Sequence, residues 1–176
     1  ELGLISSAKE ASKVAASANK ADATYLVPAF TGLGAPYWDS KAKAIICGMT
    51  RSTGKAELVR AAEECIAYQI ADIIRVMSGE SGVDIQALRV DGGPTKDAFL
   101  MQFQSDILNI PVIVPATEEL SGVGAAYAAG IALGVYDKKT IFQKISKTNF
   151  RPAMEEPERQ RRIAGWKEAV SMVLSR

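Results

Sequence analysis

The segment at residues 89–99, RVDGGPTKDAF, dominates the fold prediction for this chain. A short apolar run ends at Val90, Asp91 and two glycines follow, and a helix-compatible segment begins at about Thr95. Glycines lack side chains that would block a ligand, and a helix N-terminus directs N–H groups and a positive dipole end toward an anion. The segment therefore fits a site for a phosphate or for the ribose and base of a nucleotide. A tight turn with Asp91 bonded locally fits equally well, and no GKS or GKT of a Walker A loop follows.

Short apolar segments alternate with helical patterns on both sides of this turn. We expect strands at residues 24–30, 43–49, 87–90 and 111–115. We expect helices from Ser52 or Thr53 to Gly79 or Gly82, at about 95–108, at about 121–133, and from Pro157 onward. This order is typical of an α/β domain with a largely parallel sheet, in which ligands bind beyond the carboxyl ends of the strands. Residues 91–93 and the loop after Pro115 are two such ends.

Composition excludes several classes of function. The length of 176 residues fits one domain, and 48% hydrophobic residues are ample for a core. A net charge of +1 argues against binding nucleic acid through phosphate neutralisation. The absence of histidine excludes a Ser-His-Asp triad and a His-ligated zinc site within this chain. Cys47 and Cys65 lie in apolar patterns without CxxC spacing, so we expect buried free thiols in a reducing cytoplasm.

The most apolar run, residues 122–136, is a closely packed helix rather than a membrane span. It is shorter than the ~20 residues that a spanning helix needs, and it is rich in Gly and Ala. The text SGVGAAY within it almost meets the dinucleotide-binding pattern GxGxxG, but Tyr127 stands at its last position. A dinucleotide-binding domain is therefore the weakest alternative. The opening ELGLI resembles the end of a helix, and we expect the chain to be a fragment.

Other candidate groups have simpler interpretations. The aromatic residues Phe30, Tyr37 and Trp38 lie in a Gly/Pro loop that we expect to pack against the core. Asp39 fits a turn residue better than a catalytic acid. Glu63 and Glu64 are adjacent on a helix and point in different directions, so they are not a paired carboxylate site. For the basic residues near the end of the chain we expect a solvated helix face, comprising Arg159, Arg161 and Arg162.

Three segments together resemble the FGGY carbohydrate kinase family. The first is YLVPAFTGLGAPYWD at residues 25–39, and the second is GMTRSTGKAELVRAAEECIAYQ at residues 48–69. The third runs from LRVDGGPTKDAFLMQFQSDIL to GVGAAYAAGIALG. The ending FRPAMEEPERQRRIAGWKEAV also fits, so the resemblance covers nearly the whole chain, and it is strongest to the branch that phosphorylates glycerol.

The resemblance implies an actin-like ATPase domain of the ribonuclease H-like type, with a mixed sheet flanked by helices and incomplete at its N-terminus. Residues 1–176 would form the C-terminal nucleotide-binding domain, with a helical lead-in at 1–23, an α/β core at 24–136 and an extension with a final helix at 137–176. Members of the family use ATP and Mg²⁺. An N-terminal domain upstream of this chain binds most of the polyol or sugar substrate. The same domain carries the Asp that acts as general base. No catalytic base is therefore assigned here, and the fragment alone is expected to be inactive.

Within this resemblance Gly92 and Gly93 correspond to the family's glycine pair at the nucleotide. Asp97 stands where glycerol-specific members typically carry an Asn on the adenine side, and a carboxylate only accepts hydrogen bonds whereas an amide also donates. Glu63 stands where an apolar residue is usual. Two alternatives remain. One is a kinase for another polyol or ketose, of the xylulose, ribulose or gluconate type, and the other is a non-catalytic actin-like interaction module. The resemblance implies a cytoplasmic homodimer or higher oligomer that binds neither nucleic acid nor membrane.

Overall fold

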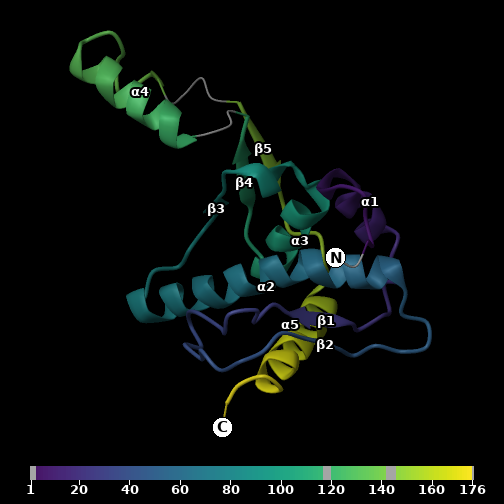
Figure 1. Cartoon of the computed structure of the whole chain (residues 1–176). Helices are drawn as coiled ribbons and strands as arrows, with labels where there is room; N and C mark the ends of the chain where they lie inside the picture. Colours follow the sequence, from purple (N-terminus) through teal and green to yellow (C-terminus); the bar gives the residue numbers. More distant parts are fainter. Residues whose placement is uncertain (1–2, 117–119, 142–145, 176) are drawn as a thin grey trace.

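The computed structural model describes residues 3–116, 120–141 and 146–175. Its helices and strands follow the expected alternation (Figure 1). The elements are η1 (Ala8–Glu10), α1 (Ala11–Ala16), β1 (Tyr25–Val27), β2 (Ile45–Cys47), α2 (Lys55–Ser81), β3 (Leu88–Arg89), η2 (Gly93–Lys96), α3 (Ala98–Leu108), β4 (Val112–Pro115), α4 (Leu120–Ala132), β5 (Lys147–Phe150) and α5 (Glu156–Ser171). Each predicted strand and helix has a counterpart, and β5 is an additional strand that the sequence pattern did not predict.

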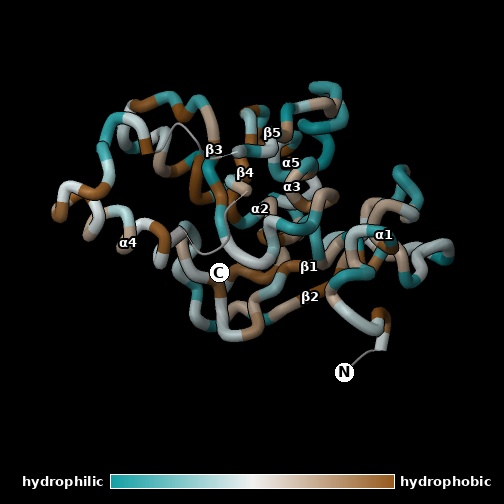
Figure 2. The backbone as a smooth tube through the Cα atoms, turned by 90° about the horizontal axis from the view of Figure 1, so that it is seen from above, coloured by the Kyte–Doolittle hydropathy of each residue, from teal (hydrophilic) through white to brown (hydrophobic). Residues whose placement is uncertain are grey.

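The strands form two small sheets within the described residues. β1 pairs antiparallel with β2, and Leu26 lies opposite Ile46. β3 pairs parallel with β4, and β4 pairs antiparallel with β5 through Val112 and Phe150. The three-stranded sheet is therefore mixed, as the family resemblance implied, and the largely parallel sheet expected from element order is limited to one strand pair. In Figure 2 the tube along β1 and β2 is largely brown, the colour of hydrophobic residues.

Helix α2 is the longest element, and its ends are set by local chemistry. Gly82 ends it in the left-handed conformation with φ of 65°, which glycine adopts without steric cost. The helix begins at Lys55 with Gly54 as its N-cap, in place of the expected cap Ser52 or Thr53, and the Gly54 N–H donates to Oε2 of Glu57 at 2.9 Å. Thr53 instead donates its hydroxyl to Asp22 at 2.8 Å, which ties the start of α2 to the segment before β1.

Helical spacing in the sequence predicts an apolar stripe on α2 that includes Ala61, Cys65, Ile66, Ile73 and Met77. Ala61 and Cys65 are buried as predicted, whereas the other three are partly exposed. The face that packs inward also carries polar and aromatic residues, including Arg60, Glu64, Tyr68 and Asp72. Hydrophobic spacing does not identify Arg60, Glu64 and Asp72 as buried, because their partners include residues on other elements.

The core joins α2, α3 and α5 through aromatic contacts. The rings of Tyr68 and Trp166 stack with centroids 5.1 Å apart and planes 8° apart. Phe103 of α3 meets Tyr68 edge-on, with ring centroids 5.3 Å apart. Trp166 is fully buried, and α5 lies alongside β1 beneath α2 (Figure 1). Helical spacing predicts an apolar stripe of Ile163, Trp166, Val170 and Val173 on this helix, and all four pack in or against the core.

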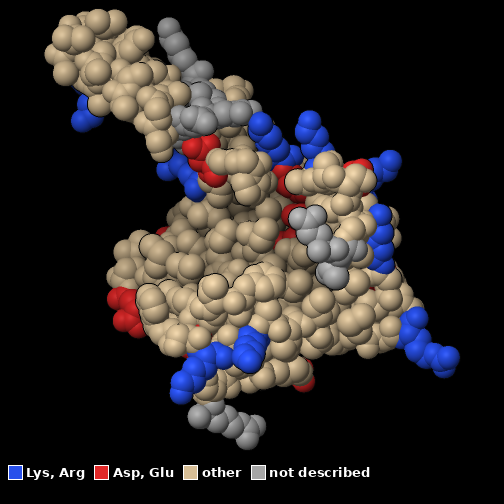
Figure 3. Space-filling model, in the orientation of Figure 1, with Lys and Arg blue, Asp and Glu red and all other residues tan. Residues whose placement is uncertain are grey.

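Helix α4 projects away from the rest of the described chain (Figure 1). It contains no charged residue, and its arm is almost wholly tan in Figure 3. We expected its small residues to lie against the sheet or another helix. Instead most of its side chains are exposed, and its tightest packing is local, where the Tyr136 ring covers Gly130. Within the described ranges no helix is long and apolar enough to cross a membrane.

Candidate functional site

The turn after β3 is built by two backbone interactions. The N–H and the hydroxyl of Thr95 both donate to the carbonyl oxygen of Gly92, at 3.1 and 2.7 Å. The N–H of Asp97 donates to the carbonyl of Pro94 at 3.1 Å. These bonds make a short 3-10 turn, η2, between the glycine pair and α3. The predicted α-helix from Thr95 therefore begins at Ala98 instead.

The backbone requires a glycine at position 92 but not at position 93. Gly92 has φ of 100°, a conformation that side chains with a Cβ rarely adopt. Gly93 has no such requirement, and among residues 3–116, 120–141 and 146–175 a Cβ placed on it would meet no atom within 4 Å beyond its chain neighbours. Neither backbone strain nor packing against these described residues requires a glycine at position 93. The open space above Gly93 is thus available to a ligand.

Asp97 begins α3 as its N-cap. Its Oδ1 accepts the Leu100 N–H at 2.9 Å, and the side chain is half-buried. The neighbouring Phe99 N–H donates to Oγ of Ser12 at 3.3 Å. Two of the first helical N–H groups, those of Phe99 and Leu100, therefore already have protein acceptors. The backbone of η2 is the part of this turn that lies next to the glycine pair.

The aromatic loop between β1 and β2 is less buried than expected. Phe30 and Trp38 are 78% and 79% exposed, whereas Tyr37 is half-buried and donates its hydroxyl to Oδ2 of Asp72 at 2.7 Å. Asp39 accepts the backbone N–H groups of Lys41 and Ala42 at 2.9 and 3.1 Å. The prediction that Asp39 is a turn residue is confirmed.

Comparison with known proteins shows which family carries this fold. Residues 2–133 match the FGGY family of carbohydrate kinases, C-terminal domain. The chain belongs to the FGGY carbohydrate kinase family. It is 46% identical over 172 residues to a glycerol kinase from Brachyspira hyodysenteriae, and 45% identical over 177 residues to one from Clostridium botulinum.

Solved structures agree with this FGGY assignment. The glycerol kinase of Plasmodium falciparum, solved with ADP, superimposes with a TM-score of 0.89 and 35% identity over 98% of this chain. A xylulose kinase from Lactobacillus acidophilus superimposes over 97% of this chain with a TM-score of 0.77 and 23% identity, which shows the shared fold alone. The chain spans 35% of the length of these relatives.

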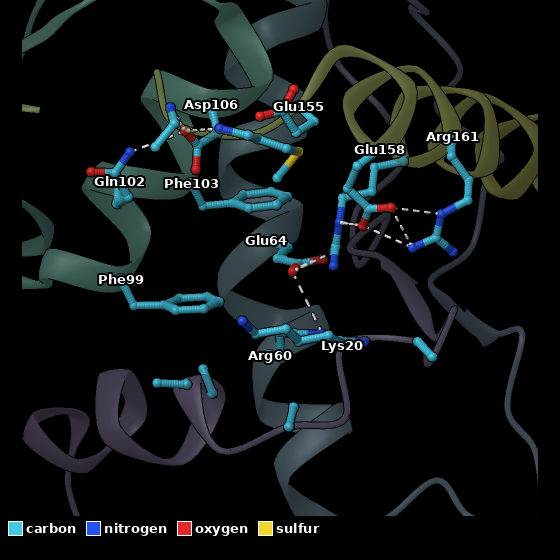
Figure 4. A pocket seen from close by; sticks show the side chains of 17 residues that line it. Lys20, Arg60, Glu64, Phe99, Gln102, Phe103, Asp106, Glu155, Glu158 and Arg161 are labelled. Carbon is cyan, nitrogen blue, oxygen red and sulfur yellow. Dashed lines mark hydrogen bonds and ion pairs between the residues drawn. The ribbon is translucent and has the colours of Figure 1, made fainter. Parts of the chain in front are cut away.

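A cavity of about 600 Å³ lies between α1, α2, α3 and α5, away from the glycine pair (Figure 4). Its charged lining is largely neutralised within the chain. Glu64, which is buried, accepts a hydrogen bond from Arg162 at 2.9 Å and lies 3.5 Å from Nε of Arg60. Arg60 also donates to the carbonyls of Asn19 and Asp22 at 2.6 and 2.7 Å. This arrangement ties α2 to α5 and to the segment after α1.

These contacts correct the expectation of a solvated basic face on the last helix. Arg159 is buried and pairs with Glu156, and the Arg162 side chain is 11% exposed. Only Arg161 keeps the exposed position that was predicted for all three. The residues Glu63 and Glu64 point apart as expected, because Glu64 is buried in the ion-pair network and Glu63 is half-buried outside it.

The cysteines and acidic residues of the described chain form no second catalytic or metal site. Cys65 is a buried free thiol as predicted, whereas Cys47 is only half-buried. In the ranges that the structure describes, no three Cys, Asp or Glu side chains form a cluster able to hold a metal ion. Part of the loop after Pro115, residues 117–119, lies outside the described residues. The turn at Gly92 and Gly93, with open space at Gly93, therefore stays the candidate site.

The sequence pattern did not predict one structural contact that holds the aromatic loop in place. Asp72 accepts hydrogen bonds from Tyr37 and Trp166, both at 2.7 Å, and so joins the aromatic loop to α2 and α5. An Asp in the middle of an apolar helix was the available signal, because a buried carboxylate requires donors. Its partners are far apart in the sequence, and no local pattern identifies them.

Proposed function

We propose that this chain is the nucleotide-holding part of an ATP-dependent kinase that converts glycerol to glycerol 3-phosphate. The observation that carries the proposal is the unfilled space at Gly93, in a chain whose relatives include glycerol kinases at 44–46% identity. The structural relative solved with ADP is also a glycerol kinase. The domain assignment, with residues 1–176 forming the C-terminal nucleotide-binding domain, is part of the same proposal.

Phosphoryl transfer requires positioning and charge stabilisation more than covalent chemistry from the protein. In this proposal the glycine pair lets the nucleotide approach the backbone, and the turn η2 supplies polar backbone groups beside it. Asp97, whose carboxylate accepts the Leu100 N–H, would lie on the adenine side of the nucleotide, as the family resemblance implies. The general base that activates the glycerol hydroxyl, and most of the glycerol pocket, belong to the upstream part of the full-length enzyme.

A magnesium ion would accompany the nucleotide phosphates. Mg²⁺ keeps several waters and is commonly bound through one or two carboxylates together with substrate phosphates. The described residues contain no cluster of three acidic or thiol side chains, so they do not form a protein-held metal site by themselves. We therefore assign no step of the reaction to a metal held by this chain. A cytoplasmic location and a homodimeric or larger assembly belong to the proposal as well.

The test is a substrate comparison with the full-length enzyme. ADP release is measured with ATP and each of glycerol, xylulose, ribulose and gluconate, and the product is identified by phosphorus NMR. We expect glycerol 3-phosphate, with kcat/KM for glycerol at least tenfold above that for the other acceptors. A higher kcat/KM with another acceptor would show that this acceptor, and not glycerol, is the substrate. Absence of turnover with every acceptor would favour a non-catalytic module. The isolated 176-residue chain is the control and is expected to give no turnover.

A further inference from the structure

One face of α3 lines the cavity between α1, α2, α3 and α5. Phe99, Phe103 and Asp106 follow one another at helical spacing, which places them on the same side of α3. All three side chains point into the cavity in Figure 4. The rings of Phe99 and Phe103 lie parallel, with their centroids 6.3 Å apart. The wall that α3 contributes therefore consists of two aromatic rings followed by a carboxylate.

The two oxygens of the Asp106 carboxylate have different surroundings. Oδ1 accepts hydrogen bonds from the N–H groups of Ala153 and Met154, at 2.7 and 3.2 Å, and from the Gln102 amide at 3.0 Å. No described residue donates a hydrogen bond to Oδ2, although Asp106 is only 8% exposed. The three donors to Oδ1 are uncharged groups. A buried carboxylate without a cation is unfavourable, so Oδ2 is an acceptor that a charged donor in the cavity would satisfy.

The other charges of the lining leave a surplus of negative charge. Most of them are paired with one another, in a network of Arg60, Glu64, Glu158, Arg161 and Arg162. Glu155 follows Met154, whose N–H bonds to Asp106, and its carboxylate forms no ion pair with a described residue. Among the cations of the lining, Lys20 alone lacks an ion pair to a described carboxylate. Two unpaired carboxylates against one unpaired ammonium favour a cationic ligand over an anionic one.

The cavity has the size and the apolar walls of a small-molecule site. Its volume of about 600 Å³ lies within the range of roughly 300–1,000 Å³ that is usual for such sites. The two Phe rings, Met154 and alanines of α1 supply apolar surface. Cations are attracted to the faces of aromatic rings, and the Arg162 guanidinium already lies 5.7 Å from the Phe103 centroid. An ammonium group also offers three N–H donors. These properties together suit a primary amine on an apolar body.

We propose that this cavity binds a small primary amine, with its ammonium group hydrogen-bonded to Oδ2 of Asp106 and its apolar body against Phe99 and Met154. The Glu155 carboxylate adds attraction for the positive charge. No residue of the turn at 91–97 lines the cavity, so the amine site is separate from the candidate nucleotide site. The inference goes beyond the proposed function and does not depend on it.

The experiment measures binding of benzylamine to the full-length enzyme by titration calorimetry. Two probes of similar shape differ from it in charge, because benzyl alcohol is neutral and benzoate is an anion. We expect a Kd for benzylamine of about 1 mM or lower, which a ligand of this size can reach. The other two probes should bind at least tenfold more weakly, since a hydrogen bond between charged groups is worth at least this factor. Saturating ADP should leave the affinity for benzylamine unchanged.

Two variants with matched controls assign the site. Asp106→Asn keeps the Oδ1 acceptor and replaces Oδ2 with an NH₂ donor, so it should weaken benzylamine binding at least tenfold. The control Asp84→Asn, at an exposed position outside the cavity, should bind like the wild type. Ala153→Phe adds a ring to the lining beside Asp106 and should also weaken binding at least tenfold. Its control is Ala164→Phe, on the exposed side of α5, which should not.

Melting temperatures show whether each variant is folded. If Asp106→Asn does not fold, Ala153→Phe and the neutral probe decide. Equal affinity for benzylamine and benzyl alcohol, unchanged affinity in a folded Asp106→Asn, or no binding of benzylamine would overturn the inference. Competition between benzylamine and ADP would place the amine in the nucleotide site and would overturn it as well. Failure of ADP to bind would count against the proposed function and leave this inference standing.

Discussion

The indole Nε1 of Trp166 donates a hydrogen bond of 2.7 Å to Oδ2 of Asp72, 94 residues earlier in the chain. The same carboxylate oxygen accepts the Tyr37 hydroxyl at 2.7 Å, and Oδ1 accepts from Arg75 at 3.1 Å. Burial, together with the hydrogen bond to Asp72, raises the pKa of the Tyr37 hydroxyl, so it remains a donor at neutral pH. One carboxylate thus fastens the aromatic loop and the last helix to α2.

Replacing Asp72 with Ala should destabilise the protein by about 3 kcal/mol, because three donors lose their acceptor and one of them, Trp166, is fully buried. Urea unfolding followed by tryptophan fluorescence measures the effect. The control is Asp84→Ala, at an exposed position, which should change stability by less than about 0.5 kcal/mol. Equal midpoints for the two variants would show that the Asp72 hydrogen bonds do not stabilise the fold.

Gly92 and Gly93 should respond differently to alanine. Gly92→Ala forces a Cβ onto a backbone with φ of 100° and should cost about 1–2 kcal/mol of stability. Gly93→Ala adds a methyl group to open space and should change stability by less than about 0.5 kcal/mol. Thermal unfolding of both variants measures the difference. Equal losses of stability would contradict the distinction between Gly92, which its backbone angle requires, and Gly93, which only leaves open space.

The two cysteines should resist thiol reagents in the folded protein. Burial raises the pKa of the Cys65 thiol to about 12 and raises that of Cys47 as well, so both remain protonated at pH 7.5. Cys47 is half-buried and should react before Cys65, and both should react rapidly in urea. Mass spectrometry after timed alkylation assigns each site. Faster modification of Cys65 than of Cys47 would contradict the burial described here.

The contact between Asp39 and Ser175 should depend on pH. The Ser175 hydroxyl and N–H donate to the Asp39 carboxylate at 2.6–2.8 Å, and these bonds lower the pKa of Asp39 from its ordinary value of 3.8 to about 2. The folded-state pKa lies below the unfolded one, so the contact stabilises the fold above pH 4 and is lost as pH falls through 2. NMR of the Ser175 amide should show a midpoint near 2, and Asp39→Asn should abolish the titration. A midpoint near 4 would show that the contact does not form in solution.

The sequence predicted most elements of this fold because their signals are local. Gly82 ends α2 and Pro157 lies in the first turn of α5, as their backbone preferences require. Strand β5 was missed because Lys147–Phe150 is largely polar and exposed, and its pairing with β4 is its main support. Asp97 carried a recognisable local signal, since Asp is a favoured N-cap residue, and this signal places the start of α3 after the 3-10 turn.

Contacts between distant residues were the part that local patterns did not predict. Arg162 resembled a solvated residue because its partner, Glu64, is 98 positions away. The exposed apolar surface of α4 has the same origin, because packing depends on surfaces that a local pattern does not contain. At the candidate site the glycine pair was identifiable from sequence. The different roles of Gly92 and Gly93 became visible only with the backbone angle and the surrounding space.

The central claim, that Gly93 leaves room for the nucleotide, is tested most directly by calorimetric titration of ADP into the full-length enzyme. The wild type is compared with Gly93→Leu and with Gly79→Leu, which also adds a side chain to open space but lies on α2. We predict that Gly93→Leu weakens ADP binding at least tenfold at an unchanged melting temperature, while Gly79→Leu binds ADP like the wild type. Equal ADP affinity in the wild type and Gly93→Leu would contradict the claim.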